Sequence, residues 1–246
     1  MDARDKARAL AHLVESITDP SVRVRYLRHV ALAMDPAELA DLVTVAAHGA
    51  EARDGAQGAL LLALCLALAD EEAAELREAI VHAALAGGQH ATAALLSPAR
   101  GAREADEPLG VPDFGAGRPL ALGERKSLAR RRDRDLLARV LRDPHPDVIR
   151  ILLGNPTLTE DDVVRLSAQR PVSPEVLREV FRSPRWIVRY RVRRAIVQNP
   201  FAPLDVALQL AVHLNAADAR AIVASADLAP PLRDACRRVA GMATLH

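Results

Sequence analysis

The chain has 246 residues, of which half are apolar but only 2% are aromatic, and its formal net charge is +1. Its core must therefore consist mainly of Leu, Ala, Val and Ile, which pack well between closely spaced helices. Strands favour β-branched and aromatic residues in alternation, and the sequence has no sustained alternation, so it excludes a β-rich fold and predicts an all-α protein.

The longest apolar run covers residues 59–69 and predicts a buried core helix. It spans about 11 residues, whereas a membrane-crossing helix needs roughly 20. The N-terminal residues 1–5 lack the basic and then apolar layout of a signal peptide. Cys65 and Cys236 lie far apart within apolar patterns, which indicates buried, reduced thiols. We therefore expect a cytoplasmic protein with no membrane segment.

Short helices with clear start signals are predicted for the N-terminal part of the chain. Asp19-Pro20 and Asp35-Pro36 each place a capping side chain before a proline, which is tolerated at the first helical position. Glycines and Pro98 close the later segments. The predicted helices cover residues 3–17, 20–34, 36–48, 56–69, 71–86 and 89–96.

Residues 97–123 have a different composition, rich in Gly and Pro and without helical periodicity. A structureless connection of this length is uncommon inside a compact domain. We expect either a mobile crossover between two halves or a segment draped over the surface.

A charged helix over residues 124–142 is predicted after this linker, with its cluster at 130–135 forming a solvated face. A sequence motif then recurs in which one helix ends, a tight turn follows and a new capped apolar helix begins. It is present at residues 155–164, 170–177 and 199–207. Residues 20–43 can also be aligned without a gap to residues 184–207, with seven of the 24 positions identical.

Repeated helix pairs indicate units that bury their apolar faces only by stacking on their neighbours. Residues 136–210 resemble the leucine-rich-repeat-variant and HEAT-like families of α-solenoids, and residues 19–43 repeat part of the same pattern. The resemblance rests on the alternation of a Pro-x-x-Pro-x-x-Leu turn with a Val-Arg-x-x-Val-Ala-x-Asn-Pro helix. It implies a solenoid of short stacked helix pairs, in two arrays joined by the Gly/Pro-rich linker. Some members of these families carry an iron–sulfur cluster in a cysteine-rich segment, but this chain has no such segment.

Charge divides the chain into an acidic and a basic half. Residues 1–110 hold 10 Lys+Arg against 17 Asp+Glu, whereas residues 111–246 hold 23 against 15. We expect an acidic N-terminal repeat domain at 1–96, the linker at 97–123 and a basic C-terminal repeat domain at 124–246. The asymmetry is consistent with an anionic partner for the basic half or with self-association through the oppositely charged halves.

No known catalytic or metal-binding motif is present. The sequence lacks a phosphate-binding glycine loop, a Gly-x-Ser-x-Gly elbow, a His-Glu-x-x-His pair and a Cys-x-x-Cys pair. Its eight histidines are scattered. The acidic run at residues 160–162 follows Thr159 and is typical of the first turn of a helix. We therefore predict no catalytic residue, no metal site and no cofactor.

One candidate binding surface lies in residues 182–194. In a continuous helix its arginines would form one stripe, with two aromatic side chains beside them, an arrangement that suits phosphates and bases. An alternative is that these arginines tie adjacent helices together, since the pair Arg25-Tyr26 recurs as Arg189-Tyr190. The candidate residues are Arg182, Arg185, Trp186, Arg189, Tyr190 and Arg193.

The expected function is that of a non-enzymatic adaptor or scaffold that binds a protein partner on a helical-repeat surface. The competing hypothesis is a DNA- or RNA-binding HEAT-like protein, including a base-repair glycosylase, which would use the helix at 182–194. A glycosylase also needs a catalytic carboxylate near that face, and the sequence nominates none.

Overall fold

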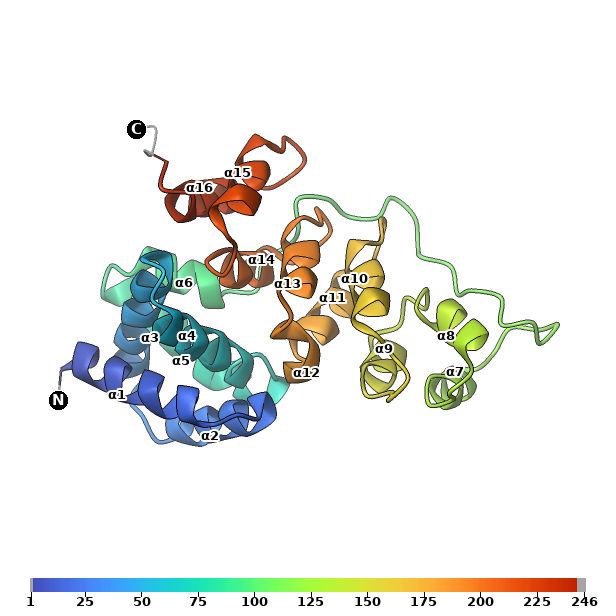
Figure 1. Cartoon of the computed structure of the whole chain (residues 1–246), viewed down its shortest axis with the longest axis horizontal. Helices are drawn as coiled ribbons and strands as arrows, with labels where there is room; N and C mark the ends of the chain where they lie inside the picture. The colour runs from blue at the N-terminus through green and yellow to red at the C-terminus, as the bar shows by residue number, and fades with distance from the viewer. Residues whose placement is uncertain (1, 243–246) are drawn as a thin grey trace. The chain divides into compact units, whose positions relative to one another are not determined.

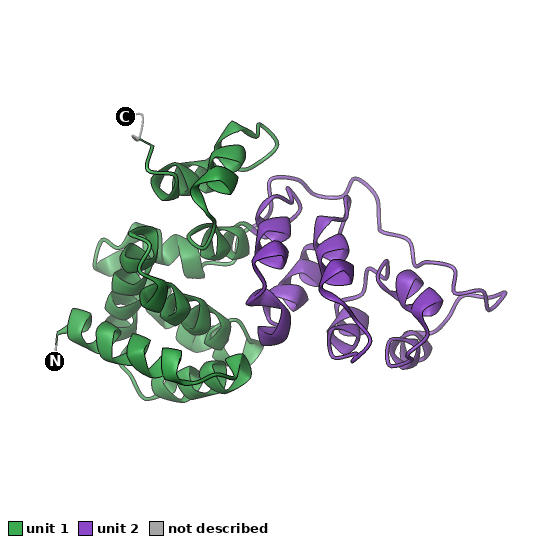
Figure 2. Ribbon diagram, viewed as in Figure 1, with its two compact units in different colours: residues 1–99, 204–246 green, residues 100–203 purple. Residues whose placement is uncertain are grey.

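The computed structural model describes residues 2–242, and within this range it contains helices and no strand. The all-α prediction is confirmed. Two compact units divide the chain (Figure 2): unit 1 comprises residues 1–99 and 204–246, and unit 2 comprises residues 100–203. Unit 1 carries 12 Lys+Arg and 18 Asp+Glu, a net charge of −6, and unit 2 carries 21 and 14, a net charge of +7. Among the described residues, no helix is both long and apolar enough to span a membrane.

The N-terminal part of unit 1 contains the helices predicted from its caps and glycines (Figure 1). Asp19 accepts a hydrogen bond from the amide of Ser21 at 2.7 Å, and Asp35 accepts one from Ala37 at 2.8 Å. Each cap satisfies a backbone N–H that the first helical turn leaves without a partner. The helices are α1 (Ala3–Ser16), α2 (Pro20–Leu32), α3 (Pro36–Glu51), α4 (Gly55–Ala67), the 3-10 turn η1 (Glu71–Ala73), α5 (Ala74–Ala86) and α6 (His90–Leu96).

Helix α4 forms the core of unit 1. Every residue from Leu60 to Ala67 is buried, and α4 contacts α1, α2 and α3. A helix that is apolar on all sides must be surrounded by other helices, because no side of it is suited to water. The predicted buried core helix is therefore confirmed.

The last three helices belong to unit 1 and not to the basic C-terminal array that we expected at 124–246. They are α14 (Leu204–Ala211), α15 (Ala216–Ala224) and α16 (Pro230–Val239). Seven successive residues of α14, Asp205 to Ala211, are buried. Gln209 donates a hydrogen bond to the carbonyl of Leu95, and Asp205 accepts one from the amide of Ala99. Buried polar groups need such partners, and these lie on unit 1.

Unit 2 contains seven short helices. They are α7 (Leu122–Leu128), α8 (Arg134–Val140), α9 (Pro146–Leu153), α10 (Glu160–Ala168), α11 (Pro174–Phe181), α12 (Pro184–Ile187) and α13 (Tyr190–Val197). The predicted single helix at 124–142 is wrong, because Asp133 is not on a solvated helix face but caps α8. Its carboxylate accepts hydrogen bonds from the amides of Asp135 and Leu136 at 3.0 and 3.1 Å.

Alternate helices of unit 2 pack side by side. Helix α9 contacts α7 and α11, and α10 contacts α13 (Figure 1). Two buried asparagines reinforce this packing. The Nδ2 of Asn155 donates to the carbonyls of Ala129 and Arg131 at 2.9 and 2.7 Å. The equivalent atom of Asn199 donates to the carbonyls of Ser167 and Gln169 at 2.8 and 2.9 Å.

Residues 100–121 form no helix and follow the surface of unit 2. The amide of Arg103 donates to the carbonyl of Pro200 at 2.9 Å, directly after α13. At Gly101 a Cβ atom would lie only 2.7 Å from the carbonyl oxygen of Ala202, so this close approach requires glycine. Further along, Leu109 lies beside α8 and α10. These contacts place residues 101–103 and 109 against other parts of unit 2.

Candidate functional site

The predicted arginine stripe at 182–193 does not form, because the segment is divided among three short helices. Pro184 lacks an amide hydrogen and begins α12 after α11 has ended at Phe181. Arg189 has an extended backbone (φ −78°, ψ 122°) and caps α13. The six candidate residues therefore do not lie on one continuous helix, and the helical periodicity that would align their side chains is interrupted.

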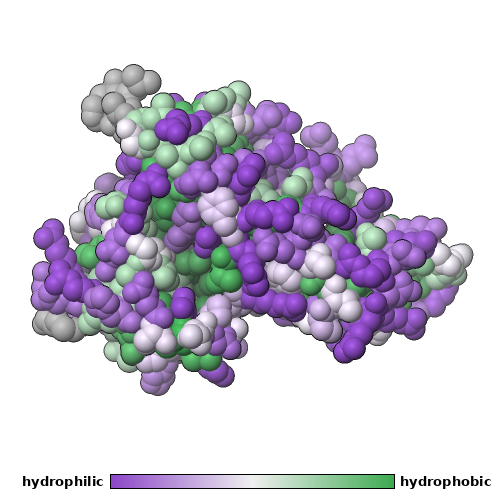
Figure 3. Space-filling model, in the orientation of Figure 1, coloured by the Kyte–Doolittle hydropathy of each residue, from purple (hydrophilic) through white to green (hydrophobic). Residues whose placement is uncertain are grey.

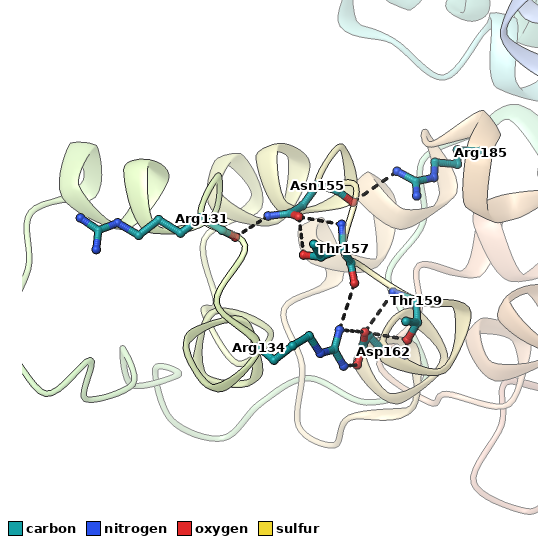
Figure 4. Close-up of polar contacts among 7 residues, drawn as sticks. All are labelled: Arg131, Arg134, Asn155, Thr157, Thr159, Asp162 and Arg185. Carbon is teal, nitrogen blue, oxygen red and sulfur yellow. Dashed lines mark hydrogen bonds and ion pairs between the residues drawn. The ribbon is translucent and has the colours of Figure 1, made fainter.

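Trp186, the only tryptophan in the chain, is a buried packing residue. It is 4% exposed, and its Nε1 donates a hydrogen bond to the carbonyl of Leu153 at 2.8 Å. The guanidinium carbon of Arg185 lies 4.4 Å from the centre of the Trp186 ring, and Arg185 also donates to the carbonyl of Asn155 (Figure 4). This indole face is covered by an arginine of the same chain and is not presented to a base.

The remaining candidate residues lie in separate environments. Arg182 pairs with Glu179 at 2.8 Å. Arg193 lies with its guanidinium carbon 6.0 Å from the centre of the Tyr190 ring, and burial lowers its pKa below the usual arginine value. Arg189 is exposed. The structure thus brings together Arg185 with Trp186 and Arg193 with Tyr190, but it does not assemble all six into one surface.

A different set of arginines lines a groove in unit 2. The groove has a volume of about 570 Å³ and is formed by α8, α10, the turn after each of them, and Leu109 and Gly110 of the linker. We call it the arginine groove. Its charged lining residues are Arg134, Arg142, Asp143, Asp162, Arg165 and Arg170. Hydrophilic side chains also predominate on the molecular face drawn in Figure 3.

Asp162 and Arg134 form a fixed ion pair at one side of the arginine groove. The guanidinium of Arg134 donates to both carboxylate oxygens of Asp162, at 2.7 and 3.0 Å (Figure 4). Thr159 adds hydrogen bonds from its amide and hydroxyl at 3.0 and 2.7 Å. The hydrogen bonds from Arg134 are the main cause that lowers the pKa of Asp162 to about 2. Asp162 therefore remains ionised at neutral pH, and its charge is already balanced.

Asp143 is neutralised by a second, fully buried pair. Its side chain has no exposed surface, and Nη1 of Arg125 lies 2.6 and 2.8 Å from its two carboxylate oxygens. Asp143 also accepts a hydrogen bond from the amide of His145 at 2.9 Å. Burial of this charge is tolerated because these donors replace water.

Two arginines of the groove lack a fixed partner. Within residues 2–242, the guanidinium groups of Arg142 and Arg165 form no hydrogen bond or ion pair, and both residues are exposed. By contrast, Arg170 donates to the carbonyl of Gln198 at 2.5 Å, which holds its side chain but leaves its charge unbalanced. The groove therefore presents positive charge in excess of its own carboxylates.

Unit 1 contains a larger pocket of about 670 Å³, whose lining is largely apolar and includes Leu95, Leu208 and Val212. Its charged residues are engaged within the chain: Glu51 pairs with Arg238 at 3.0 Å, and Asp234 pairs with Arg237. In the described part of the chain, no group of three or more His, Cys, Asp or Glu residues is placed to hold a metal ion. The arginine groove is accordingly the stronger candidate for a binding site.

The sequence did not single out the arginine groove, because Arg142 and Arg165 belong to different predicted helices with no shared motif. Pro144 was a usable signal, since a proline disfavours helical continuation and therefore places Arg142 at the end of the preceding helix. In comparisons with known proteins, no family model, no curated protein and no solved structure matches this chain.

Proposed function

We propose that this protein is a non-enzymatic adaptor that binds a protein partner on the surface of unit 2. The observation that carries the proposal is the arginine groove, in which two exposed arginines without partners lie beside a network of satisfied hydrogen bonds. A site of this kind can recognise a ligand without chemistry, because its walls, formed by α8, α10 and the Arg134–Asp162 pair, are held in place before the ligand arrives.

The proposal includes a HEAT-like solenoid for unit 2. Supporting it are the alternate packing of α7, α9 and α11 and the contact of α10 with α13. Asn155 and Asn199 make the same pair of hydrogen bonds to carbonyls of an earlier helix end, which is what a structural repeat would require. One fold can serve many functions, so the charge of the arginine groove supports the adaptor proposal more strongly than the helix arrangement does.

Nucleic-acid binding, the competing function, has less support. Base stacking needs exposed aromatic rings, whereas Trp186 is buried and hydrogen-bonded. Of the charged candidate residues, Arg182 and Arg193 are engaged within the chain, which leaves fewer guanidiniums for phosphates. We therefore rank a protein partner ahead of DNA or RNA.

Site-specific photo-crosslinking in the cells that make the protein tests the adaptor proposal. A photoreactive benzoylphenylalanine would replace Ala138, which lines the arginine groove, or Ala168, an exposed residue of α10 outside it. Ala217, exposed on α15 of unit 1, is the matched control position. We expect discrete, nuclease-resistant protein adducts from a unit 2 position and none from Ala217.

Three outcomes would overturn the adaptor proposal. Adducts that disappear after nuclease treatment would identify nucleic acid as the partner. Adducts only with a second copy of the chain, in a salt-sensitive oligomer, would favour self-association of oppositely charged units. Turnover of a substrate by the purified protein, lost on substitution of a defined carboxylate, would identify an enzyme.

A further inference from the structure

We propose that the arginine groove binds an acidic peptide segment of the partner, with carboxylates of that segment paired to Arg142 and Arg165. This inference rests on the proposed adaptor function and specifies its site and ligand chemistry. Both guanidiniums are exposed at the groove and have no partner among residues 2–242. Arginine binds carboxylates in a bidentate geometry, so two fixed positions give direction as well as attraction.

The excess positive charge of the arginine groove favours an anionic ligand. Its lining contains four arginines and two aspartates, and both aspartates are already paired, Asp162 with Arg134 and Asp143 with Arg125. Arg125 lies outside the lining, so the positive charge of Arg142, Arg165 and Arg170 is not offset by any carboxylate of the groove. A cationic or neutral ligand would leave these charges uncompensated, whereas an acidic segment would balance them.

The uncharged lining selects a polypeptide over a nucleic acid. Leu109, Ala138 and Pro171 contribute accessible apolar surface, and no aromatic residue lines the groove. Aliphatic side chains of a peptide can pack against such a surface, but bases need aromatic faces for stacking.

Fluorescence anisotropy with a defined probe tests this inference. The probe is a fluorescein-labelled ten-residue peptide with four glutamates and two leucines, and the matched peptide has glutamine in place of each glutamate. We expect binding of the acidic peptide that weakens with added salt, and little binding of the glutamine peptide. The full-length protein is used throughout.

Charge-neutralising variants locate the site. We expect Arg142→Gln and Arg165→Gln each to weaken acidic-peptide binding about tenfold, because each removes one charge-assisted contact. Arg132→Gln is the control, since Arg132 is exposed, lies in unit 2 and does not line the groove. It should weaken binding less than about twofold, because it removes a solvent-screened charge outside the lining of the groove. Circular dichroism and urea midpoints that match the unsubstituted protein establish that each variant is folded.

The inference is overturned if the Arg142→Gln/Arg165→Gln double variant binds the acidic peptide as the unsubstituted protein does, or if the glutamine peptide binds equally well. It is also overturned if a DNA strand of equal charge binds more tightly and shows the same sensitivity to the two arginines. If crosslinks from Ala168 persist while Ala138 yields none, the adaptor function stands and the assignment of the groove falls.

Discussion

Replacing Asn155 with alanine tests whether the buried asparagines hold unit 2 together. Asn155 is 3% exposed. Its Nδ2 donates to the carbonyls of Ala129 and Arg131, and its Oδ1 accepts from the amide and hydroxyl of Thr157 at 3.0 and 2.7 Å. Figure 4 shows the contacts with Arg131 and Thr157. Alanine would leave two carbonyls, one amide and one hydroxyl without these partners. We expect the free energy of unfolding to fall by about 3 kcal/mol, since each net hydrogen bond contributes about 1 kcal/mol and buried groups left without a partner add a desolvation cost.

Urea denaturation followed by circular dichroism measures this change, and hydrogen exchange locates it. Amides of unit 2 should lose more protection than amides of unit 1. Asn199→Ala should cost somewhat less than Asn155→Ala, because its Nδ2 makes the same pair of contacts but its Oδ1 accepts only from the amide of Phe201. Asn215→Ala is the control. Asn215 is an exposed helix cap that accepts from the amide of Asp218 at 2.8 Å, and its loss should cost about 1 kcal/mol. If Asn155→Ala lowers the free energy of unfolding no more than Asn215→Ala does, the hydrogen bonds of the buried asparagines do not stabilise the packing of unit 2.

Three further predictions concern Asp162, Trp186 and the two cysteines. Because the pKa of Asp162 is lowered from 3.8 to about 2, its stabilising contribution is complete above about pH 4 and is lost as the pH falls towards 2. Asp162→Asn should therefore reduce stability by about 2 kcal/mol at pH 7 and by much less at pH 2, and an equal loss at both pH values would contradict this linkage. Trp186→Phe should cost about 1 kcal/mol by deleting the indole hydrogen bond, and acrylamide should quench native Trp186 emission far less than emission in urea. Efficient quenching in the native protein would show that the indole is exposed. Burial raises the pKa of both Cys65 and Cys236 to about 12, so at pH 8 a disulfide reagent should label neither thiol before unfolding, and rapid labelling of the native protein would contradict their burial.

Local signals made much of the helical structure predictable. An aspartate before a proline acts on amides two residues away, as the caps at Asp19 and Asp35 show. The uninterrupted apolar run at 59–69 required burial on all sides, and α4 is the core of unit 1. Such signals depend on neighbouring residues only, so they can be read without knowledge of the rest of the chain.

Where those local signals were ambiguous, packing within the folded chain determined the backbone conformation. The cluster at 130–135 is consistent with a continuous charged helix, but α7 ends at Leu128, Asn155 binds the carbonyls of Ala129 and Arg131 in the break, and Asp133 caps the start of α8. The stripe at 182–193 has no glycine or proline near Arg189, and yet the chain becomes extended there. On either side of this residue, Trp186, Ile187 and Val192 are buried. Burial of these side chains outweighs the modest preference of the segment for one helix.

By itself the sequence determined the helical class, the positions of most helices in the first 96 residues and the non-helical character of the linker, because caps, periodicity and composition are local properties. Only the tertiary structure decided that α14 belongs to unit 1 and that an arginine groove exists. Asp205 and Gln209 reach partners 106 and 114 residues away, and Arg134 reaches Asp162 across 28 residues. Partners at such separations are selected by packing and by the need to satisfy buried polar groups, and neither requirement leaves a signal in any short stretch of sequence.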